Sequence, residues 1–358
     1  MDSQSFIERN SLKKNSLTAR LFNTWQQAVL NNKIVNQFEA QQDDLDHRWQ
    51  RGDRILYGVK YLDHQFTYYA CNLTQNFEIA DSIEQRPIAD TGGYFCILNG
   101  YRTLRPSDGY PSIGRQPDIP SAPHTCRFYC QNPVHPLSLL NREPLLNVPL
   151  PHFTWNAYYN AAPLQPEGHF LWIPTQPENS LPHWLQQLTP ALIEDALALF
   201  AQVSDVILYF NGLHAGASVN HIHFQAVYHT QALPVESAPV KDYKDYQLLT
   251  NCLIEPAVFS AERSDQLIHY VEALQRCGLP FNLLMASNRV LVIAKDSAHE
   301  IVAELHPNGM AALEVCGAIT VSDRATFTSL NASRLKQALQ KMVVPASQVI
   351  DQLEKTIE

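Results

Sequence analysis

The 358-residue chain lacks the features that would tie it to a membrane or to a nucleic acid. No apolar run approaches the roughly 20 residues of a membrane span, and residues 1–15 are polar, without the apolar core of a secretory signal. Only 26 Lys and Arg stand against 35 Asp and Glu, a net charge of −9, whereas phosphate backbones and anionic lipids attract clustered cations. Seven cysteines at irregular spacing form no disulfide framework. These absences predict a cytoplasmic protein that binds neither nucleic acid nor membrane.

The local patterns alternate between helices and short β-runs, without βαβ repeats. Sixteen of the 23 prolines lie within residues 106–190 and exclude long helices there. Helices are predicted over residues 17–40, 190–200, 261–276, 333–342 and 347–357. Strands are predicted over residues 54–59, 66–71, 168–174, 206–210, 221–228, 281–286 and 289–294. This order predicts an α+β fold.

The last third of the chain repeats the order of the central part less clearly, and the strand at 290–293 loosely resembles the strand at 170–173. An internal duplication and a single irregular unit both agree with that pattern. The length allows two packed units. We divide the chain into residues 1–230, the N-terminal and central part with the motif at 211–226, and residues 231–358, a C-terminal half.

The sequence His-Ile-His-Phe-Gln at residues 221–225 is the most informative motif. Because successive side chains of a strand point to opposite faces, His221, His223 and Gln225 share one face. The other face is apolar and can pack on a core, whereas two imidazoles and an amide have chemical uses and little structural need. The preceding loop, 211–220, is rich in small residues, which lets backbone N–H groups approach a phosphate closely.

Such a strand can carry out nucleophilic catalysis on a phosphate. A neutral imidazole can attack the phosphorus of a nucleotide ester and form a phosphoramidate, which splits one displacement into two easier steps. Histidine suits this role because its pKa of about 6.5 leaves it largely unprotonated at neutral pH. Charge grows on the phosphate oxygens and needs donors around it. The amide of Gln225 can donate, and Gly216, Ala217 and Ser218 can supply backbone N–H groups and a hydroxyl.

Two other interpretations compete with this one. His-x-His strands also occur in cupin-type metal sites, which add a glutamate a few residues later, but residues 226–231 contain no carboxylate. The two histidines could instead be satisfied structural groups, although the amide and the small-residue loop favour a site. His169 lies in an apolar strand and is predicted to be a core histidine. Trp155 and Trp172 are predicted to pack in the core rather than stack on a base.

Residues 211–226 resemble the signature of the transferase branch of the histidine-triad superfamily, which holds galactose-1-phosphate uridylyltransferase, diadenosine tetraphosphate phosphorylase and the GDP-hexose phosphorylases. The sequence at 220–226, Asn-His-Ile-His-Phe-Gln-Ala, is most similar to the motif of the GDP-hexose phosphorylases. Triad hydrolases carry a third histidine where this chain has Gln225, so the resemblance is to transferases and phosphorylases. Segments 160–174 and 281–295 extend it over about residues 150–300.

The resemblance implies an HIT-like antiparallel sheet with flanking helices and a reaction through a covalent nucleotidyl-histidine. His223 would be the nucleophile, His221 would orient it, and Gln225 would bind the nucleotidyl phosphate. Relatives often have an arginine near the position of Lys295, so a phosphate contact there is a further guess. The predicted nucleotide- and phosphate-binding residues are Asn160, Asn211, Gly212, Gly216, Ala217 and Ser218.

The predicted activity is that of a phosphorylase acting on a nucleotide-sugar of the GDP-hexose type or on a dinucleoside polyphosphate, with inorganic phosphate as acceptor. The alternatives are uridylyl transfer between hexose 1-phosphates and an inactive homologue that only binds a nucleotide or a metal. The reaction requires no cofactor, and the sequence is compatible with a homodimer.

A structural zinc ion is a separate hypothesis. Cys126 and Cys130, with His135 nearby, could hold part of a zinc site, since relatives in this branch use a cysteine pair for one. The remaining ligands are not apparent, because the chain has Glu-Asn at 178–179, after the strand at 168–174, where relatives may offer a histidine. Thiols without a metal are the alternative.

Overall fold

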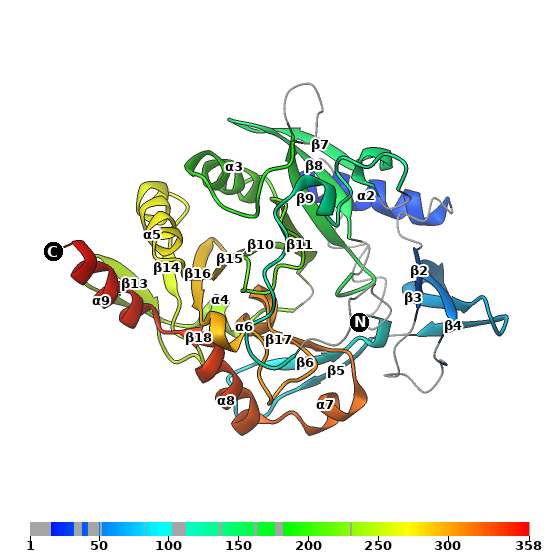
Figure 1. Ribbon diagram of the computed structural model, residues 1–358. Coiled ribbons are helices and arrows are strands. Elements are labelled where there is room, and N and C mark those ends of the chain that lie inside the picture. Colours follow the sequence, from blue (N-terminus) through cyan, green and yellow to red (C-terminus); the bar gives the residue numbers. More distant parts are fainter. Residues whose placement is uncertain are drawn as a thin grey trace.

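A large antiparallel sheet forms the centre of the molecule (Figure 1). The computed structural model describes residues 16–31, 38–41, 50, 52–81, 83–101, 112–135, 138–160, 163–175, 182–229 and 231–357. Within them, the large sheet has eleven strands in the order β12-β13-β14-β16-β15-β10-β11-β9-β8-β7, with β18 paired to β16. These strands are β7 (Leu146–Pro149), β8 (Thr154–Tyr159), β9 (His169–Thr175), β10 (Val206–Asn211), β11 (Phe224–Tyr228), β12 (Val240–Tyr243), β13 (Tyr246–Leu249), β14 (Ala257–Phe259), β15 (Phe281–Ala286), β16 (Arg289–Lys295) and β18 (Val343–Val344).

Two smaller sheets lie beside the large one. The first is an antiparallel meander of β1 (Phe38–Gln41), β2 (Arg54–Leu62), β3 (Gln65–Asn72) and β4 (Phe77–Asp81). The second joins distant parts of the chain: β5 (Glu84–Pro87) pairs antiparallel with β6 (Phe95–Leu98), and β17 (Ala318–Val321) pairs with β6 in parallel. The N-terminal and C-terminal parts of the chain are therefore tied together by backbone hydrogen bonds.

Helices flank the sheets. The α-helices are α2 (Leu17–Leu30), α3 (Pro190–Phe200), α4 (Pro234–Ser237), α5 (Ser264–Arg276), α6 (Ala312–Cys316), α7 (Arg324–Ser329), α8 (Ala332–Met342) and α9 (Ala346–Ile357). Short 3₁₀ helices are η3 (Pro123–Thr125), η4 (Leu139–Asn141) and η5 (Ser297–His299). Helix α3 begins as predicted, with the Thr189 side chain accepting from the Leu192 N–H and Pro190 in the first turn. In the described part of the chain, no helix is long and apolar enough to cross a membrane.

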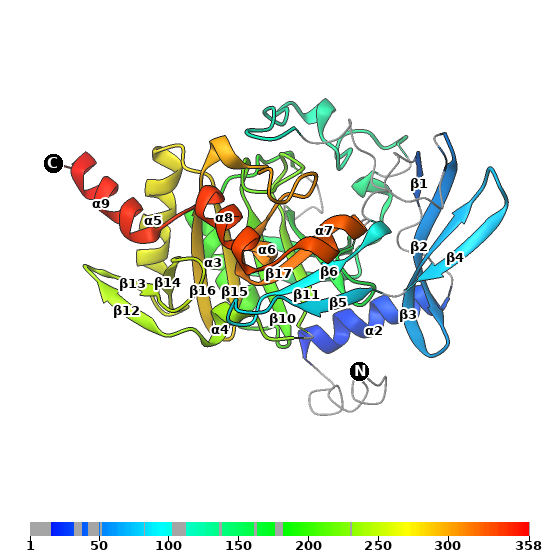
Figure 2. The ribbon, with the colours of Figure 1, turned by 90° about the horizontal axis from the view of Figure 1, so that it is seen from below.

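Alternate residues of the central strands pack into different cores. On β10, Leu208 and Phe210 pack with residues of α2, α3, α5 and α9, whereas Ile207 and Tyr209 pack with residues of the β17-β6-β5 sheet and α6–α8. Figure 2 shows that small sheet and helices α6–α8 in front of the large sheet. Trp155 and Trp172 are fully buried, which confirms their predicted place in the core. Because layers cover both faces, β11 is apolar on both sides except at Gln225.

The large sheet has the same order of elements twice. Strands β7, β8 and β9, helix α3 and the β10–β11 pair are followed by strands β12, β13 and β14, helix α5 and the β15–β16 pair, and the two sets meet where β10 pairs with β15. This repeat favours the duplication. The halves differ at one loop: residues 212–223 connect β10 to β11, whereas Ser287 and Asn288 alone connect β15 to β16. The division after residue 230 stays a prediction, because one continuous sheet spans both halves.

The predicted helices and strands are confirmed except at three places, one of which is the helix expected over 261–276, which begins only at Ser264. The helix expected over 17–40 ends at Leu30, where the N–H of Asn31 closes the last turn, and residues 38–41 instead pair with β2 as an edge strand. Pairing with β2 there outweighs the local helical pattern. The strand expected over 221–228 begins only at Phe224. Residues 221–223 do not pair within the sheet, because the N–H groups of Ile222 and His223 bond to Trp184 and Gln186 instead.

Candidate active site

His223 lies directly before β11 and is held as a single tautomer. Its Nδ1 is 2.8 Å from the carbonyl oxygen of His221. A carbonyl oxygen can only accept, so Nδ1 carries the proton and Nε2 keeps its lone pair. No hydrogen bond to Nε2 is formed by any residue that the structure describes. Burial lowers the pKa of His223 to about 4, partly opposed by the bond to His221, so the ring is neutral at pH 7 and Nε2 can act as a nucleophile.

Gln225 has a fixed amide orientation. The N–H of Leu164 donates to Nδ1 of His169 at 2.9 Å, so Nε2 of His169 carries the proton and donates to Oε1 of Gln225 at 2.9 Å. The hydroxyl of Tyr209 donates to the same oxygen at 3.1 Å. With its oxygen held by these donors and by Nδ2 of Asn160 at 3.5 Å, Gln225 presents its NH₂ group to another acceptor, and a phosphate oxygen is a suitable one.

His169 is more than the core histidine that the sequence suggested. Its side chain is buried, as expected, but its ring orients Gln225 and also lies 3.2 Å from Nδ2 of Asn160. Asn160, a predicted site residue, lies 3.5 Å from Oε1 of Gln225. The pairing of β9 with β11 places His169 opposite Val227, diagonal to Gln225. Only the pairing register, which sequence reasoning did not supply, links these residues.

Residues of β15 and α6 hold the start of the loop after β10 by hydrogen bonds. Oδ1 of Asn211 accepts from Nδ2 of Asn282 and from the N–H of Ala312, each at 3.0 Å. The N–H of Ala217 donates to the carbonyl of Gly212 at 3.2 Å. Two of the predicted phosphate contacts are thus already engaged: the oxygen of Asn211 supports the loop, and the Ala217 N–H closes a turn instead of facing a phosphate.

The two loop glycines are needed for packing. A Cβ on Gly212 would lie 2.7 Å from the carbonyl oxygen of Phe281, and one on Gly216 would lie 2.6 Å from Cβ of Ala311. Gly216 also has a φ of +97°, which disfavours other residues. The loop therefore lies against β15 and the start of α6. Phosphate binding by Gly216 and Ser218 stays a prediction.

Substitution of Gly216 tests this packing. We expect Gly216→Ala to lower the free energy of unfolding by about 2–3 kcal/mol, because it adds both a clash and backbone strain. Gly278→Ala is the matched control, since Gly278 has a φ of +64° but open space around its Cα; it should cost only about 1 kcal/mol. Urea unfolding of the two variants measures the difference, and equal losses would show that the contact with Ala311 is not tight.

The Lys295 side chain is held within the protein. Its side chain is fully buried, and its Nζ donates to the carbonyl of Met310 at 3.2 Å. Burial lowers its pKa to about 8, against the opposing charge of Glu314. A phosphate contact by Lys295 stays a prediction; in this arrangement its ammonium group supports the segment that leads into α6.

A group of four potential metal ligands lies next to His223. The ligand atoms of Cys126, Cys130, His183 and His221 all lie within 4.8 Å of one another. Sγ of Cys126 is 3.5 Å from Nδ1 of His221, and Sγ of Cys130 is 3.4 Å from Nδ1 of His183. Burial, with the charges of His223 and His183, lowers the pKa of His221 to about 3. Two thiols and two imidazoles are the donor set of a closed, four-coordinate zinc site.

This group corrects the ligand prediction. The cysteine pair is part of it, but His135 is not; the ring of His135 stacks on Tyr129 with a centroid separation of 3.4 Å. The sequence pattern did not indicate His183, and residues 178–179, where relatives may offer a histidine, lie outside the described residues. His221 contributes its ring to the group and its carbonyl to His223, so the contact that orients the nucleophile is made by the backbone.

Solved structures with similar architecture include yeast Ap4A phosphorylase Apa2 in complex with Ap4A, at 15% identity, a TM-score of 0.50 and coverage of 74% of this chain and 90% of that one. The same enzyme in complex with AMP matches at 16% identity and a TM-score of 0.50, covering 74% and 88%. This chain has the histidine-triad fold. The predicted α+β architecture, an HIT-like antiparallel sheet with flanking helices, is confirmed.

Sequence comparison adds one histidine-triad relative. GDP-L-galactose phosphorylase 1 of Arabidopsis thaliana is 34% identical over 90 residues, which are 22% of this chain and 20% of that protein. The match thus spans about a fifth of the relative's length. No protein-family model matches the chain. The similar proteins found by structure and by sequence are both phosphorylases.

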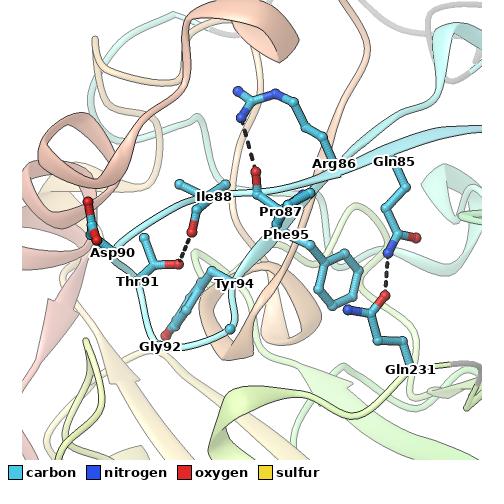
Figure 3. A pocket seen from close by; sticks show the side chains of 11 residues that line it. Gln85, Arg86, Pro87, Ile88, Asp90, Thr91, Gly92, Tyr94, Phe95 and Gln231 are labelled. Carbon is cyan, nitrogen blue, oxygen red and sulfur yellow. Dashed lines mark hydrogen bonds between the residues drawn. The ribbon is translucent and has the colours of Figure 1, made fainter.

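A pocket of about 360 Å³ lies elsewhere on the histidine-triad fold, beside β5 and β6 (Figure 3). Its polar groups bond within the protein: Arg86 donates to the carbonyls of Phe327 and Leu330, the Thr91 hydroxyl donates to the carbonyl of Ile88, and Gln85 bonds Gln231. None of the predicted site residues lines it. The candidate active site is therefore the region around His223.

Proposed function

We propose that this protein is a phosphorylase that works through a covalent nucleotidyl-His223 intermediate. The observation that carries the proposal is the tautomer of His223, whose Nδ1–H is bound to the carbonyl of His221 while no described residue forms a hydrogen bond to Nε2. Gln225, two residues on, has its oxygen held by His169 and Tyr209 and its NH₂ group available to the phosphate. An unprotonated nucleophile and an oriented donor are the two groups that nucleotidyl transfer needs.

The reaction would run in two displacements. Nε2 of His223 attacks the α-phosphorus, an N–P bond forms, and the P–O bond to the leaving sugar phosphate or nucleoside polyphosphate breaks. An oxygen of inorganic phosphate then attacks the same phosphorus, the N–P bond breaks, and a nucleoside diphosphate leaves. His223 returns to its neutral state with Nδ1 still bonded to His221. The buried surroundings of the ring would limit attack by water on the intermediate.

A nucleotide-sugar of the GDP-hexose type is the proposed substrate. The motif sequence at 220–226 and the similarity to GDP-L-galactose phosphorylase support this choice. A dinucleoside polyphosphate is the second candidate, favoured by the likeness of the fold to Ap4A phosphorylase. Uridylyl transfer between hexose 1-phosphates remains a third. Gly212, Gly216 and Ser218 are proposed to surround the phosphates.

A substrate screen tests the proposal. The protein is incubated with GDP-sugars, UDP-sugars, ADP-sugars and diadenosine polyphosphates, each with and without inorganic phosphate, and the released nucleotides are separated. We expect a nucleoside diphosphate that appears only when phosphate is present. Release of a nucleoside monophosphate without phosphate would identify a hydrolase and contradict the proposal. Nucleotide exchange that depends on a hexose 1-phosphate instead would identify a uridylyltransferase-type reaction.

We also propose that Cys126, Cys130, His183 and His221 hold a structural zinc ion. Four protein ligands would close the coordination shell, so the metal would cross-link the chain and supply no open position for substrate. Its contribution would be to fix the main chain at His221, whose carbonyl holds His223. Burial and the neighbouring Cys126 raise the pKa of Cys130 to about 12, so a bound cation would be needed to deprotonate this thiol.

The orienting role of His169 leads to a testable prediction. We expect His169→Leu to lower the rate of nucleotidyl transfer about 10- to 100-fold, because Gln225 loses the donor that fixes its amide. Tyr209→Phe removes only the second donor and should have a smaller effect. Steady-state rates with the substrate found in the screen measure both. A wild-type rate in a folded His169→Leu protein would show that the amide orientation does not matter.

A further inference from the structure

The segment just before α3 is hydrogen-bonded to the backbone around the nucleophile. Gln186 is buried, and its Oε1 accepts from the N–H of His223 at 2.9 Å. Its Nε2 donates to the carbonyls of Asn211 and His223, at 2.8 Å and 3.2 Å. Two neighbouring bonds extend the contact: the N–H of Ile222 donates to the carbonyl of Trp184 at 2.8 Å, and the N–H of Gln186 donates to Oδ1 of Asn220 at 3.0 Å.

The hydrogen bonds of Gln186 replace backbone pairing that is absent between the ends of β10 and β11. The register of β10 with β11 pairs Tyr209 with Gln225 and, two positions further on, would place Asn211 opposite His223, but the ladder stops at Tyr209. The carboxamide of Gln186 lies between the two strands instead, accepting from one and donating to both. The strands can therefore separate at His223 without leaving buried backbone groups unpaired, a cost of about 1–3 kcal/mol per group.

We infer that Gln186 is a positioning residue for the nucleophile, an inference that rests on the proposed function. Both backbone groups of His223 are bonded to the Gln186 side chain, and the ring is bonded through Nδ1 to the carbonyl of His221. Nε2 of His223 thus has a defined place relative to the phosphate. Both N–H bonds of the Gln186 amide are engaged with carbonyls, so this residue acts through the backbone groups that it holds.

A positioning role predicts a loss of rate without a loss of nucleotide binding. Methionine is about as long as glutamine and makes no such hydrogen bonds, so Gln186→Met tests the amide. Gln187→Met is the matched control, because Gln187 is the next residue and is exposed. Each protein is mixed in a rapid-quench apparatus with excess GDP-glucose or Ap4A radiolabelled at an α-phosphate, and label on protein is followed over time and nucleotide concentration.

For Gln186→Met we expect the limiting rate of labelling to fall about 100-fold, as for small displacements of a reacting atom. The apparent Kd for the nucleotide should change less than about twofold, and Gln187→Met should match the wild type. An unchanged limiting rate, or a loss confined to the Kd, would overturn the positioning role alone. If the wild type itself takes up no label from either nucleotide, the proposed function fails, and the positioning role with it.

Two further measurements distinguish a local effect of the substitution from misfolding. Hydrogen–deuterium exchange of the peptide containing residues 221–223 should be faster in Gln186→Met than in the wild type, while peptides from α3 should exchange alike; uniform loss of protection would indicate unfolding. If Gln186→Met unfolds, Gln186→Glu is used in its place, because it keeps the length of the side chain and an acceptor for the His223 N–H. Its labelling rate should fall at least about 10-fold, and a wild-type rate in this variant would overturn the inference.

Discussion

Replacement of His223 by alanine is expected to abolish covalent labelling and to lower turnover by about 10⁴-fold or more, the scale of loss seen when a nucleophile is removed. Wild-type protein incubated with a nucleotide substrate labelled at its α-phosphate should carry label that is lost in acid and retained in base, as a phosphoramidate is. The reason is structural: Nε2 of His223 is the unprotonated ring nitrogen next to the oriented amide of Gln225.

The control for this experiment is His269→Ala, since His269 is an exposed histidine on α5. It should label and turn over like the wild type. Equal labelling of His223→Ala and wild type would contradict a nucleotidyl-His223 intermediate. Full turnover without any label on wild-type protein would point to direct transfer between the two substrates.

Removal of the metal ligands should have the second large effect. Purified wild-type protein is expected to contain about one zinc ion per chain, and a Cys126→Ser, Cys130→Ser double variant should contain none. Structural zinc contributes several kcal/mol of folding free energy, so the midpoint of thermal unfolding should fall by about 5–10 °C. Because the carbonyl of His221 holds His223, turnover should also fall by about 10-fold or more.

Cys277→Ser is the matched control, because Cys277 is exposed and lies at the end of α5, outside the group of four ligands. It should keep the zinc content, the unfolding midpoint and the turnover of the wild type. Metal analysis, thermal unfolding and activity assays are carried out on the same preparations. Wild-type protein that is fully active and equally stable without metal would contradict the proposed zinc site.

The two halves of the sheet have the same order of elements but different relations to the site. The first half carries His223 and Gln225, and its loop of residues 212–223 has no counterpart between β15 and β16. The second half instead supplies Asn282, whose Nδ2 donates to Oδ1 of Asn211 and to the carbonyl of Ala215. One half thus provides the reactive groups, and the other supports the loop that leads to them.

The sequence alone pointed to the proposed chemistry and determined much of the local structure. The residue types predicted the hairpin turn at Ser287 and Asn288, and both residues have the positive φ angles that such a turn requires. The start of α3 was readable from its Thr-Pro pair. The motif at 221–225 pointed to nucleotidyl transfer because its residue types have few other uses in that order. These are properties of neighbours in the chain.

Only the tertiary structure decided how the motif residues are used. His221 shares one face with His223 in the alternating pattern, yet its ring lies with Cys126 and its carbonyl binds His223. Gln186 interrupts the ladder just where the pattern predicted a strand. The partners that settle these roles come from segments about 35 to 95 residues away in sequence, and periodicity describes only the chain's own faces. Which group meets which across the sheet depends on packing and register, and these form only when the whole chain folds.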